Sequence, residues 1–242
     1  MSRDFNSEIS DNERKYAYSF DYDVIHGYMI KAFKAHFRTG AALELGCYQG
    51  AFTERLIDHF DDITSIDASS DALSEAKKKQ KLLNVRFVEG TFENTVLYRK
   101  YENIFLTHVL EHVDDRIALL KKIRELWLAD GGAFYVACPN AYAPSRQIAV
   151  HMGLVEYPEA VTESEKAHGH RVTYSMETLE NDLLSAGFTI KDSSGIFFKA
   201  LANFQWDKLL YTDIISQEYI DGCYELGKKY PNLCSSIYCI CE

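Results

Sequence analysis

Short apolar runs alternate with amphipathic segments between residues 41 and 138. The runs have the length of strands, and the segments between them repeat apolar residues at helical spacing. The runs expected to form strands are Ala41–Leu45, Ile63–Ile66, Val85–Val88, Asn103–Thr107 and Ala133–Cys138. Strands that alternate with helices are joined by right-handed crossovers into a parallel sheet. The pattern therefore predicts an α/β fold with helices on both faces of the sheet.

The amphipathic segments predict the helices, whose ends are marked by capping residues and by glycine. We expect helices over Tyr16–Phe37, Phe52–Phe60, Ser70–Gln80, Arg116–Leu128, Met176–Ala186 and Asn203–Leu226. Two later apolar runs, Phe188–Asp192 and Ser235–Cys241, complete the expected strands. Residues 140–174 show weak periodicity, and a loop of that length in a compact domain usually serves a function, such as a lid.

Composition limits the functions that this fold could serve. Apolar residues make up 47% of the 242 residues, which is enough for a sizeable core. The formal net charge of −10 argues against non-specific binding to the phosphates of a nucleic acid. The six cysteines include no C-x-x-C pair, the N-terminus lacks an apolar signal core, and no stretch is apolar enough to span a bilayer. We expect a reduced, cytoplasmic protein, monomeric or homodimeric, that binds neither nucleic acid nor membrane.

A glycine turn follows the first predicted strand, where residues 42–50 read ALELGCYQG. Gly46 and Gly50 lack a Cβ, so the backbone can turn tightly and approach a ligand there. Asp67 ends the next strand about 20 residues later, where an open α/β sheet places a carboxylate that accepts from both hydroxyls of a ribose. The combination predicts a nucleoside cofactor.

The turn differs from those that bind phosphate. A dinucleotide-binding turn reads G-x-G-x-x-G, but its middle glycine is missing here, and no Gly-Lys-Ser/Thr of a P-loop follows. Glu44 adds a carboxylate just before the turn, which would repel a phosphate and attract a cation. S-adenosylmethionine has a ribose, an adenine and a sulfonium but no phosphate, so the residues point to this cofactor.

Three further stretches complete a recognisable pattern. Residues 107–115 read THVLEHVDD, residues 131–140 begin with GG and end with PN, and residues 170–175 read HRVTYS, with AGF following at 186–188. Together with the glycine turn, these stretches resemble the ubiquinone-pathway-like, small-molecule branch of the class I S-adenosylmethionine-dependent methyltransferases. The resemblance implies a Rossmann-like fold with a mostly parallel, seven-stranded sheet and helices on both faces.

The resemblance implies a single methyltransferase domain over residues 1–242. Its expected parts are an aromatic N-terminal helix or lid (16–37), a cofactor-binding core (41–138), an insertion that caps the substrate (140–174) and C-terminal helices and strands (176–242). The cofactor-binding residues that it implies are Glu44, Gly46, Tyr48, Gly50, Asp67, Ala68, Thr91, Phe92, Thr107 and His108. Tyr48 replaces a common second glycine, so its side chain must turn away or form part of the pocket.

The implied reaction is in-line attack of a substrate nucleophile on the sulfonium methyl group, helped by alignment of the two reactants. A hydroxyl nucleophile gains from a general base, a role for which histidine is suited. The candidate catalytic residues are His108, His168 and His170, and the candidate substrate-binding residues are Tyr22, His26, Arg146 and Arg171. We expect a small-molecule acceptor with a hydroxyl or carboxylate oxygen, in secondary-metabolite or polysaccharide biosynthesis.

Other interpretations stay open at this point. His168 and His170 could be a metal pair or a loop anchor, although we assign no metal ligand. Residues 108–112 match the inverted zinc-protease motif H-x-x-E-H, but they follow a strand inside a methyltransferase pattern, where Glu111 and His112 would open the next helix. The acceptor could also be a nitrogen, an RNA or a protein, or the chain could bind the cofactor without catalysis.

Overall fold

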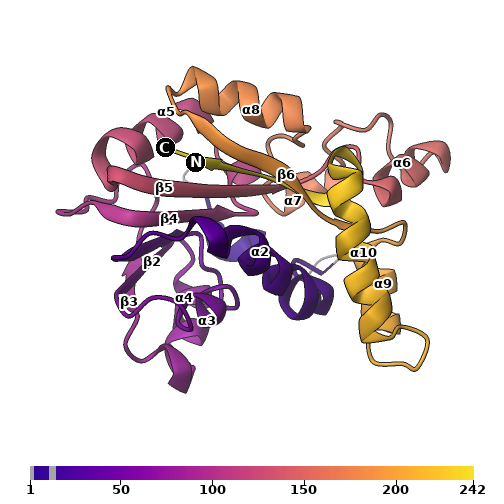
Figure 1. The fold of residues 1–242 in the computed structure, drawn as a ribbon, viewed down its shortest axis with the longest axis horizontal. Helices are drawn as coiled ribbons and strands as arrows, with labels where there is room; N and C mark the ends of the chain where they lie inside the picture. Colours follow the sequence, from indigo (N-terminus) through magenta and orange to yellow (C-terminus); the bar gives the residue numbers. More distant parts are fainter. Residues whose placement is uncertain (1–2, 11–14) are drawn as a thin grey trace.

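The computed structural model describes residues 3–10 and 15–242, which form one mixed sheet with strands in the order β3-β2-β1-β4-β5-β7-β6 (Figure 1). The strands are β1 (Ala42–Leu45), β2 (Ile63–Asp67), β3 (Arg86–Glu89), β4 (Tyr101–Thr107), β5 (Leu128–Pro139), β6 (Ile190–Phe198) and β7 (Cys234–Cys241). Strands β1 to β5 run parallel, whereas β7 pairs antiparallel with both β5 and β6. The predicted fold class, a mostly parallel seven-stranded sheet, is confirmed.

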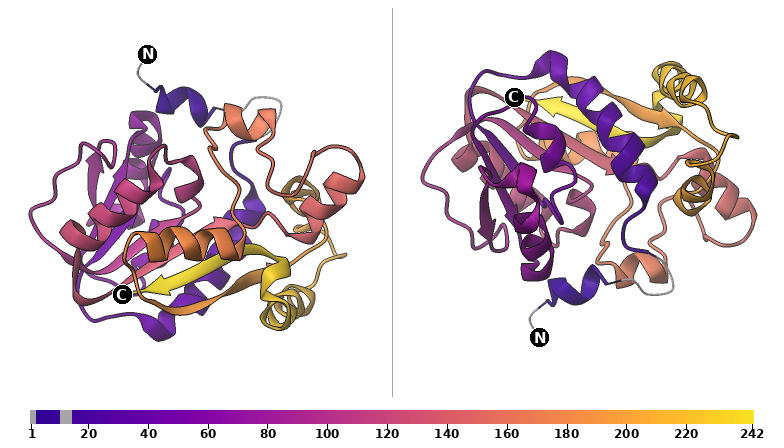
Figure 2. Two further views of the ribbon diagram at one scale, coloured as in Figure 1. Left: turned by 90° about the horizontal axis from the view of Figure 1, so that it is seen from above. Right: turned by 90° about the horizontal axis from the view of Figure 1, so that it is seen from below.

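Helices cover both faces of this sheet (Figures 1 and 2). The α-helices of the described residues are α1 (Phe5–Glu8), α2 (His26–Phe33), α3 (Thr53–Leu56), α4 (Ser70–Lys78), α5 (Arg116–Lys122), α6 (Pro144–His151), α7 (Glu163–Ala167), α8 (Met176–Ser185), α9 (Asn203–Leu209) and α10 (Gln217–Lys229). On one face, Leu120 of α5 and Leu183 of α8 join the core. On the other face, Phe33 of α2, Leu56 of α3 and Tyr224 of α10 do so. Both faces of the central strands are therefore buried, which explains their largely apolar sequences.

The first described residues are tied to distant parts of the chain. Arg3 donates from Nη1 to the carbonyl oxygen of His112 at 2.7 Å and from Nη2 to that of Gly169 at 3.3 Å. These bonds fix α1 beside the end of α7, as Figure 2 shows. The N-terminal segment and the insertion after β5 therefore meet over one end of the sheet.

The expected N-terminal helix over Tyr16–Phe37 starts later in the structure. A π-helical turn (Asp21–Ile25) leads into α2, and a 3₁₀ turn (Lys34–His36) ends it. Its aromatic residues divide between two places, because Phe20 and Phe33 are buried in the core whereas Tyr16 lines a cavity.

Several other boundaries also differ. Strand β6 covers Ile190–Phe198 rather than Phe188–Asp192, because it is an edge strand whose polar first half hides its apolar second half. The predicted helix Asn203–Leu226 is two helices, since Ser216 caps α10 by accepting from the backbone of Tyr219 at 3.2 Å. The apolar residues 214–215 lie between the two helices, and they continue the helical spacing of apolar residues in the sequence, which explains the prediction of a single helix.

The remaining differences are smaller. The predicted helices Phe52–Phe60 and Arg116–Leu128 are shorter as α3 and α5, and a π-helical turn to Trp127 lets β5 begin at Leu128 instead of Ala133. The irregular segment 140–174 contains two helices, α6 and α7. No helix among the described residues is long and apolar enough to cross a membrane.

Candidate active site

A cavity of about 990 Å³ lies at the carboxyl ends of the parallel strands. Its floor comes from the turn after β1, the end of β2 and the segment after β4. Its walls come from the residues before α2, from the insertion around α6 and α7, and from the segment after β6. The segments predicted as lid and substrate cap therefore line the same cavity as the predicted cofactor turn.

The glycine turn holds an unusual backbone conformation at three positions. Gly46 and Gly50 have φ angles of 79° and 78°, and Tyr48 has a φ of 48°. A Cβ on Gly46 would stand 2.4 Å from a methyl carbon of Val109, so no other residue fits there without a shift. The ring of Tyr48 packs 5.1 Å from that of Tyr16 and lines the cavity. Of the two placements expected for Tyr48, the structure therefore has the one in the pocket wall.

Asp67 faces the turn from the end of β2. Its carboxylate accepts from the backbone N–H of Tyr48 at 2.7 Å and from that of Ser69 at 2.9 Å. Burial raises the pKa of Asp67 even though these backbone N–H groups favour the charged form. The carboxylate is fixed at the cavity wall beside Ala68, and Thr91 and Phe92 line the cavity after β3.

Glu44 lies behind the turn, outside the lining of the cavity. Its Oε2 accepts from the hydroxyl of Thr53 at 2.6 Å and from that of Ser65 at 2.9 Å, while Oε1 is buried and has no hydrogen-bond partner within the described part of the chain. Burial raises the pKa of Glu44 to about 7. Glu44, which the resemblance implies as a cofactor-binding residue, therefore does not itself line the cavity. Gly50 also lies outside the lining and packs against Leu82 and α4.

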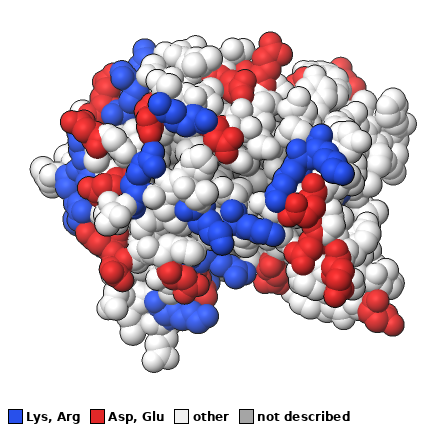
Figure 3. Space-filling view, in the orientation of Figure 1, with Lys and Arg blue, Asp and Glu red and all other residues white. Residues whose placement is uncertain are grey.

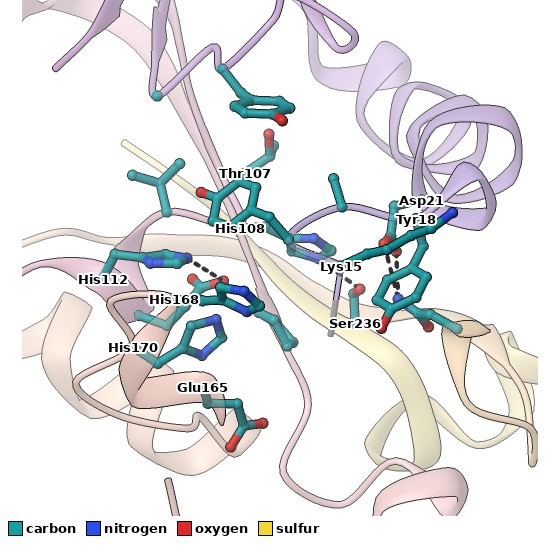
Figure 4. A pocket seen from close by; sticks show the side chains of 18 of the residues that line it. Lys15, Tyr18, Asp21, Thr107, His108, His112, Glu165, His168, His170 and Ser236 are labelled. Carbon is teal, nitrogen blue, oxygen red and sulfur yellow. Dashed lines mark hydrogen bonds and ion pairs between the residues drawn. The ribbon is translucent and has the colours of Figure 1, made fainter. Parts of the chain in front are cut away.

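His108 and Thr107 line the cavity where β4 ends. His108 has a φ of 54°, and its Nε2 lies 2.9 Å from the hydroxyl of Ser236 on β7 (Figure 4). Burial lowers the pKa of His108 to about 4, so the ring is neutral at neutral pH. A neutral imidazole in this position can accept a proton.

The predicted pair His168 and His170 lies on another wall of the cavity, with His112 (Figure 4). The ring centroids of His112 and His170 are 4.4 Å apart. Burial lowers the pKa of His170 to about 4 and that of His112 well below its ordinary value. The sequence did not single out Glu111 and His112 as cavity residues, because a 3₁₀ turn, rather than the next helix, holds them at the cavity wall.

The two arginines predicted to grip an acidic substrate are engaged within the protein. Arg146 lines the cavity but donates to Glu165 at 2.6 Å and to the carbonyl oxygen of Pro158 at 2.5 Å. Arg171 lies outside the lining and pairs with Asp114 at 2.6 Å. Both side chains therefore anchor the insertion in the structure.

Tyr22 and His26, the predicted substrate-binding residues of the N-terminal segment, also line the cavity. Two charged residues that the sequence did not suggest lie near them. Asp21 accepts from the side-chain amide of Asn203 at 2.9 Å, and Lys199 donates to the side-chain oxygen of Asn203 at 2.6 Å. Burial raises the pKa of Asp21 to about 6 and lowers that of Lys199 to about 8. Lys199 could be found only once β6 was known to run as far as Phe198.

Residues 16–193 match a family model described as a methyltransferase domain, and this match spans more than half of the chain. The chain belongs to this methyltransferase family. It is 28% identical over 109 residues to Nodulation protein S of Azorhizobium caulinodans, which covers 44% of this chain and 53% of that one. It is 27% identical over 110 residues to (S)-coclaurine N-methyltransferase of Thalictrum flavum subsp. glaucum, covering 43% and 30%. The matches thus span about half, or less, of the length of these relatives.

The fold of this methyltransferase is also found in solved structures. N-methyltransferase NodS of Bradyrhizobium japonicum WM9, in complex with S-adenosyl-L-homocysteine, superposes with a TM-score of 0.58 at 14% identity, covering 99% of this chain and 92% of that one. The likeness shows a shared fold. The predicted enzyme class is confirmed by the family match.

The residues of the cavity fit S-adenosylmethionine. The turn offers a floor at Gly46 that a Cβ would fill, and Asp67 offers a fixed carboxylate beside it. The basic residues that line the cavity, as far as the chain is described, are Arg3, Lys15, Arg146 and Lys199. None of these belongs to the turn or to β2, so this end of the cavity suits a cationic nucleoside better than a phosphate.

Proposed function

We propose that this methyltransferase transfers a methyl group from S-adenosylmethionine to a small-molecule acceptor inside the cavity. The observation that carries the proposal is that one cavity joins Asp67 and the glycine turn to His108. Its volume of about 990 Å³ stands at the upper end of the range for drug-sized ligands, roughly 300–1,000 Å³. It therefore has room for more than a cofactor alone.

In this proposal, one set of side chains binds the cofactor and another acts on the acceptor. Asp67 would accept from the ribose hydroxyls, Gly46 would allow close approach of the methionine part, and Thr91 and Phe92 would contact the adenine. The bound cofactor supplies an electrophilic methyl group on a sulfonium. The capping segments would limit the access of water, and His108 would accept the proton that the acceptor gives up.

We propose an oxygen acceptor, because a hydroxyl needs a base and His108 is neutral at neutral pH. An amine acceptor is the second candidate. It is favoured by two similar proteins, since (S)-coclaurine N-methyltransferase and NodS are both named as N-methyltransferases. A neutral amine attacks through its lone pair and loses a proton only after the methyl group has moved, so it needs His108 less than a hydroxyl does.

The acceptor is proposed to be small rather than an RNA or a protein. The cavity is capped by two segments of the chain, and on the face seen in Figure 3 basic side chains are interspersed with acidic ones. Membership of the ubiquinone-pathway-like branch is also a proposal, supported by the stretch at residues 107–115 and the HRVTYS stretch. A role in secondary-metabolite or polysaccharide biosynthesis, a cytoplasmic location and a monomeric or homodimeric state stay predictions.

Methyl transfer can be tested with S-adenosylmethionine labelled in its methyl group and three sets of acceptors: small alcohols and carboxylic acids, small amines, and bulk RNA or protein. We expect label in a small molecule. His108→Gln should lower kcat by roughly 10²- to 10⁴-fold, as loss of a general base does, with cofactor affinity unchanged. The matched control, His59→Gln, changes an exposed histidine and should retain full activity. Label found only in RNA or protein would overturn the proposal.

A further inference from the structure

A cluster of three potential metal ligands lies in the cavity wall and has no part in the proposed reaction. One ligand atom each from Glu111, His112 and His170 lies within 4.8 Å of the other two. His112 Nε2 is 4.0 Å from Glu111 Oε1. Around a tetrahedral ion with ligands at about 2.0–2.2 Å, ligand atoms stand about 3.4 Å apart. Side-chain movements of roughly 1 Å would therefore bring all three onto one ion.

The backbone holds the two segments of this cluster together. The N–H of Arg171 donates to the carbonyl oxygen of Glu111 at 2.7 Å, which ties the residue after His170 to the turn after β4. The carbonyl oxygen of His112 accepts from Arg3 at 2.7 Å. The ligand positions are therefore fixed before any ion binds, as a metal site requires.

The side chains themselves are available for a cation. Glu111 has only 1% of its surface exposed, and its Oε2 has no hydrogen-bond partner among the described residues. A buried acceptor without a partner is costly, so a cation at this point would stabilise it. The ring of His112 bonds to the backbone of His168, which orients the imidazole as bonds to metal-ligating histidines do.

Arg3, which bonds to the backbone of His112, does not occupy the site. Arg3 lies close to His112, but its guanidinium pairs with Glu8 at 2.8 Å. Its charge is therefore largely balanced by another carboxylate, and among the described residues no lysine or arginine forms an ion pair with Glu111.

We infer that Glu111, His112 and His170 form a site for a divalent transition-metal ion of the zinc class. Two imidazoles and one carboxylate are a common set of protein ligands for a catalytic zinc, which keeps a fourth position for water or substrate. Because the cluster lines the cavity, this fourth position faces the space proposed for the acceptor. An oxygen or nitrogen of the acceptor could occupy it.

The test measures metal binding without cofactor or acceptor, so its outcome is independent of the proposed function. The full-length protein is stripped with a chelator and titrated with Zn²⁺ in a calorimeter, and the bound metal is counted by mass spectrometry after desalting. We expect one equivalent of Zn²⁺. His112→Ala and His170→Ala should each weaken binding at least tenfold, since even the loss of an outer partner costs about 10- to 100-fold.

His151→Ala is the matched control, because it removes an exposed histidine at the end of α6. It should bind Zn²⁺ like the wild type. Glu111→Gln removes the carboxylate ligand but keeps the size of the buried side chain. It therefore tests the site even if an alanine variant fails to fold. Wild-type protein that binds no Zn²⁺, or Glu111→Gln and His170→Ala variants that bind it as tightly as His151→Ala, would overturn the inference.

Discussion

Glu44 provides a sharp test of how burial acts in this fold. The carboxyl group lies under the glycine turn with 1% of the residue exposed, and burial raises its pKa to about 7 from an ordinary value of 4.5. The folded state therefore binds this proton more tightly than the unfolded state. The stabilisation is complete below about pH 4.5 and is lost as the pH rises through 7.

The size of the effect follows from the same two values. Their difference, at about 1.4 kcal/mol for each pH unit, is about 3 kcal/mol. Glu44→Gln cannot ionise, yet its side-chain oxygen can still accept from Thr53 and Ser65. Relative to the variant, the wild-type protein should lose about 3 kcal/mol of unfolding free energy as the pH rises, most of it between pH 5 and 8.

The free energy of unfolding can be measured in urea at several pH values, using the fluorescence of Trp127 and Trp206. These two residues are buried on opposite faces of the sheet, so together they report on the whole core. Glu75→Gln is the matched control, because it makes the same substitution at a carboxylate that is exposed on α4. A constant difference between the wild type and Glu44→Gln across this range would refute the reasoning.

Three further predictions concern the turn, the insertion and the base. Gly46→Ala should lower the free energy of unfolding by more than the roughly 1–2 kcal/mol that a left-handed backbone costs a residue with a Cβ, because the new Cβ also meets Val109. Gly131→Ala, with a φ of 72° and open space around the new Cβ, isolates the backbone cost. Equal urea midpoints for the two variants would contradict this prediction. Arg146→Met should lower the free energy of unfolding by about 1–3 kcal/mol, because it leaves Glu165 without its arginine partner. A raised KM for the acceptor at unchanged stability would instead show that Arg146 binds the substrate. On the acid side of the pH profile, kcat should decrease near pH 4 rather than at about 6.5, because burial keeps His108 neutral down to that pH. A decrease near 6.5 in the wild type that is absent in His108→Gln would contradict this prediction.

The parallel core could be predicted because its central strands are buried on both faces and its helices on one. The glycine turn and Asp67 could also be predicted, because their positions follow from the order of strands and helices in an open sheet. The bounds of the edge strand β6 were harder to predict, because the first half of the strand is partly exposed and carries polar residues. Its true end brings Lys199 to the cavity, and no local pattern gives that.

The walls of the cavity depend on contacts between distant segments. Ser236 reaches His108 because β7 inserts antiparallel between β5 and β6, a pairing that the sequence of β7 alone does not specify. The sequence predicts Arg146 and Arg171 as substrate-binding residues, yet the insertion folds so that they pair with Glu165 and Asp114. The sequence predicts Glu111 and His112 at the start of a helix, whereas a single 3₁₀ turn holds them beside His170.

Binding of S-adenosylmethionine to Asp67→Ala tests the central claim most directly. Calorimetry on the wild type should give one bound cofactor, and Asp67→Ala should bind about 1.5–3 kcal/mol more weakly through loss of charge-assisted hydrogen bonds. That is roughly ten- to a hundredfold in Kd. Asp71→Ala, which removes an exposed carboxylate nearby on α4, should bind like the wild type. Equal affinity of Asp67→Ala and Asp71→Ala, or a wild type that binds no S-adenosylmethionine, would contradict the assignment of this cavity.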